Sequence, residues 1–162
     1  MITLRLATED DFDFYYNLKC DEFNKYWSGF ANNPKRDQLL KFYQDTILKS
    51  NDNQSRKLFI ICENETPIGE LSIKPDGEEF DMPLSLCKDK RGNNNGYNAF
   101  MLGLAKAKEL GLKKLFGKVR EDNFASAFNL QKCGVTITDE YDLVFIPVLK
   151  QEMKMYHVFK EI

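Results

Sequence analysis

The stretch of sequence that decides the fold runs Leu84-Ser85-Leu86-Cys87-Lys88-Asp89-Lys90-Arg91-Gly92-Asn93-Asn94-Asn95-Gly96-Tyr97. It begins as a strand, continues as a polar turn rich in Gly and Asn, and ends in the first residues of a helix. Gly and Asn reach positive φ at low cost, so several backbone N–H groups of the turn can point the same way. The following helix adds the positive end of its dipole, and the stretch therefore predicts an anion site suited to a phosphate.

A simpler interpretation is a turn that binds nothing, because Gly and Asn are common at strand-to-helix junctions. The turn lacks the three spaced glycines of dinucleotide-binding loops, and it does not end in the Gly-Lys-Ser/Thr of a phosphate loop. Hydride transfer with a nucleotide cofactor and NTP hydrolysis therefore lose support.

The residues after the turn predict a helix, a strand and a second helix. Apolar residues recur at helical spacing and a glycine follows them: Tyr97, Phe100, Met101, Leu104, Ala107 and then Gly111. A strand is expected over residues 114–120. Asp122-Asn123 supplies the cap of a short helix that runs to Lys132 and is closed by Gly134.

These residues carry a resemblance to a known family. Arg91-Gly92-Asn93-Asn94-Asn95-Gly96 resembles the loop that binds the pyrophosphate of acetyl-coenzyme A (acetyl-CoA) in the GNAT superfamily of N-acetyltransferases. The segments 119–126 and 131–135 are similar to the strand and helix that run beside the cofactor in that family. Two positions depart from the pattern. Asn94 stands in place of a glycine, and Leu130 stands where many members have a tyrosine that protonates the departing thiolate, a role for which leucine has no proton.

The resemblance implies direct transfer of an acetyl group from acetyl-CoA to an amine, with a carboxylate that removes the proton of the amine. Counting back from the loop places Asp81 at the commonest position of that base, with Glu79 and Glu70 as further candidates. Each of these could equally be a carboxylate that keeps the surface soluble. The resemblance further implies that the cofactor contacts Ser85, Leu86, Cys87, Arg91, Gly92, Asn93, Asn94, Asn95, Gly96, Tyr97, Asn123 and Ser126. No metal is expected.

The acceptor side is expected in the segment after the first helix. Trp27, Tyr26 and Phe30, with the carboxylates of Asp21 and Glu22 nearby, suit a cationic or sugar-like amine. The alternative is a partly buried aromatic cluster that joins two helices.

The remaining segments predict a mixed sheet with helices around it. Thr8 and Asp11 form a capping box after a first strand, a second helix is expected near Pro34 with Asn33 as its cap, and residues 58–62 and 67–73 read as a hairpin. Further strands are expected at 81–87, 143–146 and 153–159. We therefore expect an α+β (mixed α/β) GNAT fold in one domain, 1–162. Its sheet should be mixed, mostly antiparallel and twisted, with about six to seven strands and about four flanking helices.

Composition limits the function classes. The chain has 162 residues, 43% of them hydrophobic, and a net charge of −2, which argues against a nucleic-acid binder with a broadly basic face. Its four cysteines are scattered without metal spacing, and neither a signal sequence nor a membrane helix is visible, so a cytoplasmic protein without a membrane partner is expected. The single histidine, His157, is expected to pack in a strand.

Three functions remain open at this point. The leading one is an N-acetyltransferase of a small amine, amino sugar or aminoglycoside-like compound. The second is an acetyltransferase of a protein N-terminus or lysine, and the third is an acyl-CoA-binding module without turnover. The oligomeric state is expected to be monomer or homodimer.

Overall fold

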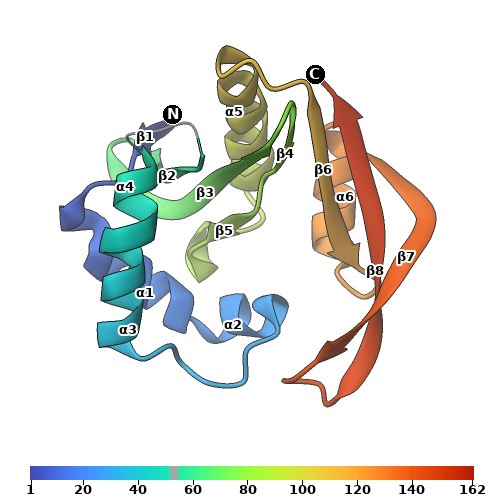
Figure 1. Ribbon diagram of the computed structural model, residues 1–162, viewed down its shortest axis with the longest axis horizontal. Coiled ribbons are helices and arrows are strands. Elements are labelled where there is room, and N and C mark those ends of the chain that lie inside the picture. The colour runs from blue at the N-terminus through green and yellow to red at the C-terminus, as the bar shows by residue number, and fades with distance from the viewer. Residues whose placement is uncertain (52–54) are drawn as a thin grey trace.

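Figure 1 shows the computed structural model of the chain, which describes residues 1–51 and 55–162. The strands lie in one sheet with the order β1-β2-β3-β4-β6-β8-β7, and β5 pairs beside β3. The strands are β1 Ile2–Leu6, β2 Lys57–Glu63, β3 Thr66–Asp76, β4 Glu79–Asp81, β5 Leu84–Leu86, β6 Lys114–Arg120, β7 Thr136–Ile146 and β8 Gln151–Glu161. β4 and β6 run parallel, whereas the other pairs described are antiparallel. The expected α+β class with a mixed, mostly antiparallel sheet is confirmed.

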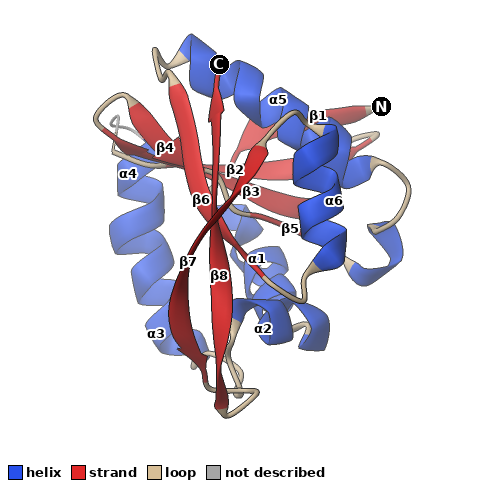
Figure 2. Cartoon of the chain, turned by 90° about the vertical axis from the view of Figure 1, so that its right-hand side faces the viewer, coloured by secondary structure: helices blue, strands red, loops and turns tan. Residues whose placement is uncertain are grey.

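The helices cover both faces of the sheet (Figure 2). They are α1 Phe12–Cys20, α2 Glu22–Ser28, α3 Arg36–Phe42, α4 Lys49–Asn51, α5 Asn95–Glu109 and α6 Phe124–Lys132. A π-helical segment, Tyr43–Leu48, joins α3 to α4 in one continuous run. One apolar cluster packs between the sheet and α5, and a second packs between the sheet and the helices α1 and α3. No helix in the described part of the chain is both long enough and apolar enough to span a membrane.

The strand expected at 81–87 is interrupted, which is why the sheet has more strands than predicted. Both pieces keep one register with β3, since Lys74 pairs with Asp81 and Gly69 pairs with Leu86. The Pro83 carbonyl accepts a 3.0 Å hydrogen bond from the Ser72 N–H, but proline has no N–H to return. The ladder of hydrogen bonds to β3 is therefore interrupted at Pro83, and this interruption separates β4 from β5.

The two pieces differ in their second neighbour. β4 pairs with β6 through Glu79 and Phe80, whereas the only partner of β5 among the described strands is β3. The sheet consequently opens between β5 and β6, beyond the point at which β4 and β6 diverge. This opening positions the candidate site.

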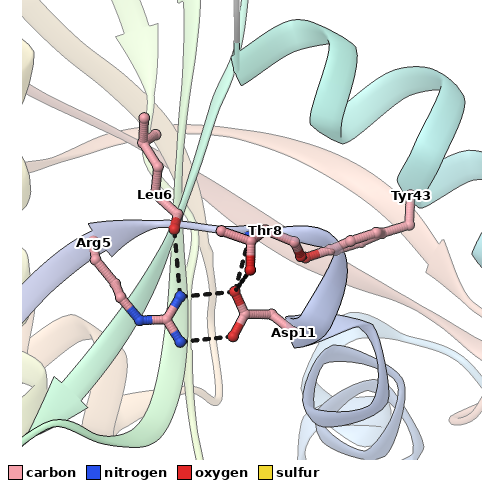
Figure 3. A network of polar contacts seen from close by, with 5 residues as sticks. All are labelled: Arg5, Leu6, Thr8, Asp11 and Tyr43. Carbon is pink, nitrogen blue, oxygen red and sulfur yellow. Dashed lines mark hydrogen bonds and ion pairs between the residues drawn. The ribbon is translucent and has the colours of Figure 1, made fainter.

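A polar network fixes the start of the chain against the helices (Figure 3). The Arg5 guanidinium donates two 2.7 Å hydrogen bonds to the Asp11 carboxylate, and the Thr8 N–H donates a third, at 2.8 Å. The Tyr43 hydroxyl donates to the Thr8 carbonyl at 2.7 Å. The predicted capping box at Thr8 and Asp11 is confirmed, and it also ties β1 to the π-helical segment.

Three local expectations were wrong. The helix predicted near Pro34 begins at Arg36 and is preceded by an extended Lys35, so Asn33 is not its cap. An additional helix, α2, precedes it, because the Asp21 side chain accepts a 2.9 Å hydrogen bond from the Asn24 N–H and caps a new turn. Met101, expected on the buried face of α5, is 39% exposed.

Candidate functional site

A cleft of about 850 Å³ occupies the opening between β5 and β6. It is bounded by both strands, by α2, by the turn that leads into α5, and by α6. Its lining consists of Phe23, Asn24, Trp27, Ser28, residues 81–86, Arg91, Gly92, Asn94, Gly96, Tyr97, Phe100, residues 115–118, Asn123, Ala125, Ser126, residues 128–130, Lys132 and Val158.

One end of the cleft is formed by the turn that opens α5. Gly92 and Asn94 have left-handed backbones, with φ of 85° and 58°, as the sequence predicted for this turn. The first N–H groups of a helix have no acceptor within it. In α5 the first such hydrogen bond runs from the Asn98 N–H to the Asn94 carbonyl, at 2.9 Å, so the N–H groups of the three preceding residues have no partner of this kind. Lys132 of α6 adds a positive charge, with its Nζ 2.8 Å from Asn94 Oδ1. These features favour an anion.

The free edge of β5 forms one wall. Pro83 and Cys87 bond to β3 through the Pro83 carbonyl and the Cys87 N–H, and Ser85 lies opposite Glu70 in the register. Because main-chain groups alternate in direction along an antiparallel strand, those of Leu84 and Leu86 point away from β3 and into the cleft. An extended ligand could pair with them there.

Arg91 ties the turn to α2. Its Nη2 donates hydrogen bonds to Asp21 Oδ1 at 2.9 Å, to Asn24 Oδ1 at 3.1 Å and to the Leu86 carbonyl at 2.8 Å. The guanidinium carbon lies 3.9 Å from the centre of the Phe23 ring. Burial would raise the pKa of Asp21, but the hydrogen bonds from the Asn24 N–H and from Arg91 outweigh it and hold that pKa below its usual value. The side chain expected to contact the cofactor thus also holds α2, which carries Trp27, a residue expected on the acceptor side.

The opposite wall belongs to α6. The Asn123 side chain accepts a 3.1 Å hydrogen bond from the Ser126 N–H and caps this helix, as predicted. Leu130 lines the cleft, so the position that resembles the family's tyrosine faces the site and carries no ionisable group. Asn129 was missed by sequence reasoning, although its spacing of three residues from Ser126 places it on the same helical face.

The three candidate carboxylates lie in different environments. Asp81 lines the cleft where β4 and β6 diverge, and its Oδ2 is 3.6 Å from Lys74 Nζ. Glu79 lies outside the lining, with its Oε1 3.2 Å from Lys114 Nζ. Glu70 is buried on β3 in an ion pair with Lys19, and its Oε2 has no partner within the described residues.

The aromatic residues of the predicted acceptor side also differ in whether they line the cleft. Trp27 lines the cleft, Tyr26 does not, and Phe30 is 65% exposed outside it. The Arg120 guanidinium carbon lies 4.8 Å from the Tyr26 ring centre and 4.4 Å from that of Trp27. The aromatic pair therefore joins α2 to β6, where the alternative interpretation had expected a joint between two helices. Phe23 was missed, because α2 itself was not predicted.

Three residues expected at the cofactor are not part of the lining: Cys87, Asn93 and Asn95. Asn95 is buried, and its Nδ2 donates to the Lys90 carbonyl at 3.1 Å. Cys87 is half-buried, and burial followed by the charge of Asp89 raises the pKa of its thiol. Asn93 is exposed. In the described part of the chain, no three His, Cys, Asp or Glu side chains gather as metal ligands.

The sequence matches the model of a protein family described as an acetyltransferase (GNAT) domain, over residues 1–136. The chain belongs to the GNAT family. It is an acetyl-CoA-dependent N-acetyltransferase, as the turn at residues 91–96 indicated. A search of curated protein sequences found no significant match to this acetyltransferase.

Solved structures share the fold of this acetyltransferase at low sequence identity. Spermidine N-acetyltransferase from Vibrio cholerae, in complex with CoA and spermine, aligns with a TM-score of 0.86 and 14% identity over 99% of this chain and 95% of that one. Ribosomal-protein-alanine N-acetyltransferase from Brucella melitensis aligns with a TM-score of 0.83 and 13% identity over 99% of both chains. An aminoglycoside acetyltransferase in complex with coenzyme A gives 0.78 and 16% over 99% and 95%. These proteins act on different acceptors, so the fold alone does not identify the acceptor of this acetyltransferase.

Proposed function

We propose that this acetyltransferase transfers the acetyl group of acetyl-CoA to the primary amine of a small molecule, with Asp81 as the general base. The observation that carries this proposal is the position of Asp81. It is the one acidic side chain among the described residues that line the cleft, and it lies at the fork of β4 and β6. A base must reach the attacking amine, and neither Glu79 nor Glu70 lines the cleft.

The residues of the cleft suit acetyl-CoA, which supplies the thioester. The N–H groups at the start of α5 and the ammonium of Lys132 suit the pyrophosphate. A β-carbon built on Gly96 would lie 3.8 Å from Leu86 Cδ1, so the glycine keeps this end of the cleft open between α5 and β5. The main-chain groups of Leu84 and the N–H of Leu86, which point away from β3, suit the amides of the pantetheine arm, opposite Asn123 and Ser126.

Acetyl transfer requires that the amine lose a proton and that the thiolate of coenzyme A leave. An ammonium ion is not a nucleophile, so Asp81 accepts the proton of the amine, directly or through water, before attack on the thioester carbonyl. The departing thiolate needs no strong acid, because a thiol with a pKa of about 8.5 is a tolerable leaving group. Leu130 is therefore compatible with turnover. Tyr97 and Ser126 are hydroxyl-bearing residues in the lining.

A small acceptor is favoured by contacts that join α2 to β6 and β7 beside the cleft. The Arg120 guanidinium donates to the Tyr26 carbonyl at 3.3 Å, which joins β6 to α2. A β-carbon on Gly29 would lie 3.7 Å from Ile146 Cγ2, so the end of α2 also lies near β7. Figure 1 shows α2 beside the far end of the β7–β8 hairpin. A protein tail would have to thread between these elements, whereas a small amine would not.

Titration of acetyl-CoA, followed by a screen of amines for coenzyme release, tests the proposal. A ligand at a hundred times its dissociation constant should add about 2.7 kcal/mol to the folded state, which appears as a raised melting temperature. Steady release of coenzyme with a small amine, and none with peptides that carry a free N-terminus, is the expected result. Tight binding without turnover across the whole panel would identify the silent binding module instead.

A further inference from the structure

The charges that line the cleft are unbalanced toward the positive. Among the described lining residues, Asp81 is acidic, whereas Arg91, Lys118 and Lys132 are basic. Lys132 lies at the turn that suits the pyrophosphate, so it belongs to the cofactor end. Asp81 and Lys118 belong to the part of the cleft near the fork of β4 and β6.

The carboxylate of Asp81 already has a cationic neighbour. Lys74 of β3 places its Nζ 3.6 Å from Asp81 Oδ2. Lys118 has its own partner outside the cleft, because its Nζ is 2.6 Å from Asp142 Oδ2 on β7. The Lys118 ammonium, and after it His157, lower the pKa of Asp142, so this carboxylate is charged at neutral pH. The fork therefore holds no excess of negative charge.

The other carboxylates considered for the acceptor side are also in ion pairs. Asp21 pairs with Arg91 at 2.9 Å, and Glu22 pairs with Lys25 at 2.7 Å. Glu70 pairs with Lys19. None of the three lines the cleft. The aromatic residues and carboxylates of residues 21–30 were expected to suit a cationic or sugar-like amine, but the carboxylates of this segment do not line the cleft.

From this arrangement we infer that the acceptor carries one amino group and no second cationic group. The inference rests on the proposed function and narrows it. The reacting amine reaches Asp81, while the rest of the acceptor lies on apolar and aromatic side chains such as Phe23, Trp27 and Phe116. A second ammonium would lose part of its hydration, find no free carboxylate among the described residues of the lining, and lie beside Lys118, whose partner Asp142 is outside that lining. Polyamines and aminoglycosides are therefore poor acceptors, although enzymes of the same fold act on them.

Matched amines test the inference. Hexylamine and 1,6-diaminohexane have the same carbon chain and differ by one ammonium, and spermidine adds another. We expect kcat/KM for hexylamine to exceed that for the diamine by about tenfold or more. We also expect salt to reduce the difference, because the Debye length falls from about 8 Å at 0.15 M to 3 Å at 1 M. A diamine or spermidine that reacts as well as hexylamine would overturn the inference.

Charge reversal at the cleft supplies the second test. Lys118→Glu should raise kcat/KM for the diamine relative to hexylamine, and Lys118→Gln should do so by a smaller factor. Lys114→Glu is the matched control, since Lys114 lies on the same strand and face but outside the lining. A diamine-to-monoamine ratio that responds equally to the changes at Lys118 and Lys114 would mean that the charge of the cleft does not select the acceptor.

A binding measurement separates this inference from the proposed function. If no amine releases coenzyme, transfer to small amines is refuted, and calorimetric titration of the same amines into the complex of the protein with CoA decides the inference alone. Tighter binding of hexylamine than of 1,6-diaminohexane supports it, and equal or tighter binding of the diamine overturns it.

Discussion

The carboxylate of Asp81 lies against the backbone of Gly117: a β-carbon built on Gly117 would be 3.3 Å from Asp81 Oδ1. Gly117 follows the last parallel pair of β4 and β6, Phe80 with Leu115, by two residues. Any side chain at this position must therefore share the fork with the carboxylate. The absence of a side chain at Gly117 leaves the carboxylate room where the sheet opens.

Substitution of Gly117 should consequently lower the rate of transfer more than it affects cofactor binding. Gly117→Ala requires the carboxylate to shift by a few tenths of an ångström, and Gly117→Val requires a larger shift. A displacement of about 1 Å can cost about 100-fold in rate, so we expect a graded fall in kcat from Gly to Ala to Val. Steady-state kinetics with hexylamine and calorimetry with acetyl-CoA make the comparison. Equal losses of kcat and of cofactor affinity would contradict it.

Asp81→Asn should lower kcat/KM most at neutral pH. An alkylamine, with a pKa of about 10.4, is almost fully protonated there and needs the base, with an expected loss of about 100-fold or more. The difference from the parent should shrink as the pH approaches the pKa of the amine, because the free amine then needs no base. A pH–rate series for the parent, Asp81→Asn and Glu79→Gln measures this. A pH profile unchanged by Asp81→Asn would assign the base to Glu79, Glu70 or a chain of waters.

Arg91→Met should affect the acceptor more than the cofactor. The guanidinium holds α2 through Asp21, Asn24 and Phe23, so its loss frees the wall that carries Trp27. We expect a raised KM for the amine and altered emission of Trp27, which is the only tryptophan of the chain. Arg91→Lys should not restore the KM of the amine, because the lysine ammonium lacks the planar, several-donor geometry of the guanidinium.

Gly96→Val is the comparison for Arg91→Met, since it fills the cofactor end and leaves α2 in place. It should weaken acetyl-CoA binding by more than Arg91→Met does, without altering the emission of Trp27. If Arg91→Met weakened acetyl-CoA binding as strongly as Gly96→Val and left the KM of the amine unchanged, Arg91 would be a phosphate ligand and not a positioning residue.

Asp11 should make folding sensitive to acid. Its burial raises the pKa, but the hydrogen bonds from Arg5 and Thr8 outweigh that and hold the pKa below its usual value. Because the folded pKa is the lower one, the stabilisation is complete above the unfolded pKa and is lost as the pH falls through the folded pKa. Asp11→Asn should cost about 1–3 kcal/mol at pH 7, and the cost should diminish below about pH 4. Urea unfolding at several pH values measures it, with the exposed Asp10→Asn as the control.

The sequence predicted the elements whose causes are local. The box at Thr8 and Asp11, the Asn123 cap and the left-handed turn at Gly92 and Asn94 each depend on residues within a few positions of one another. The spacing of apolar residues likewise predicted α5 apart from Met101. Each of these signals lies within a short stretch of the sequence, and together they were sufficient to indicate the family.

Tertiary structure alone decided which candidates meet. The position of Asp81 at the fork depends on the pairing of β4 with both β3 and β6, whose residues lie far apart in the chain. The burial of Glu70 against Lys19, outside the lining, and the attachment of Arg91 to α2 follow from the same long-range packing. A residue type and its neighbours in sequence state what a side chain can do. Which wall of the cleft it faces, and which charge neutralises it, depends on contacts that form only when the sheet assembles.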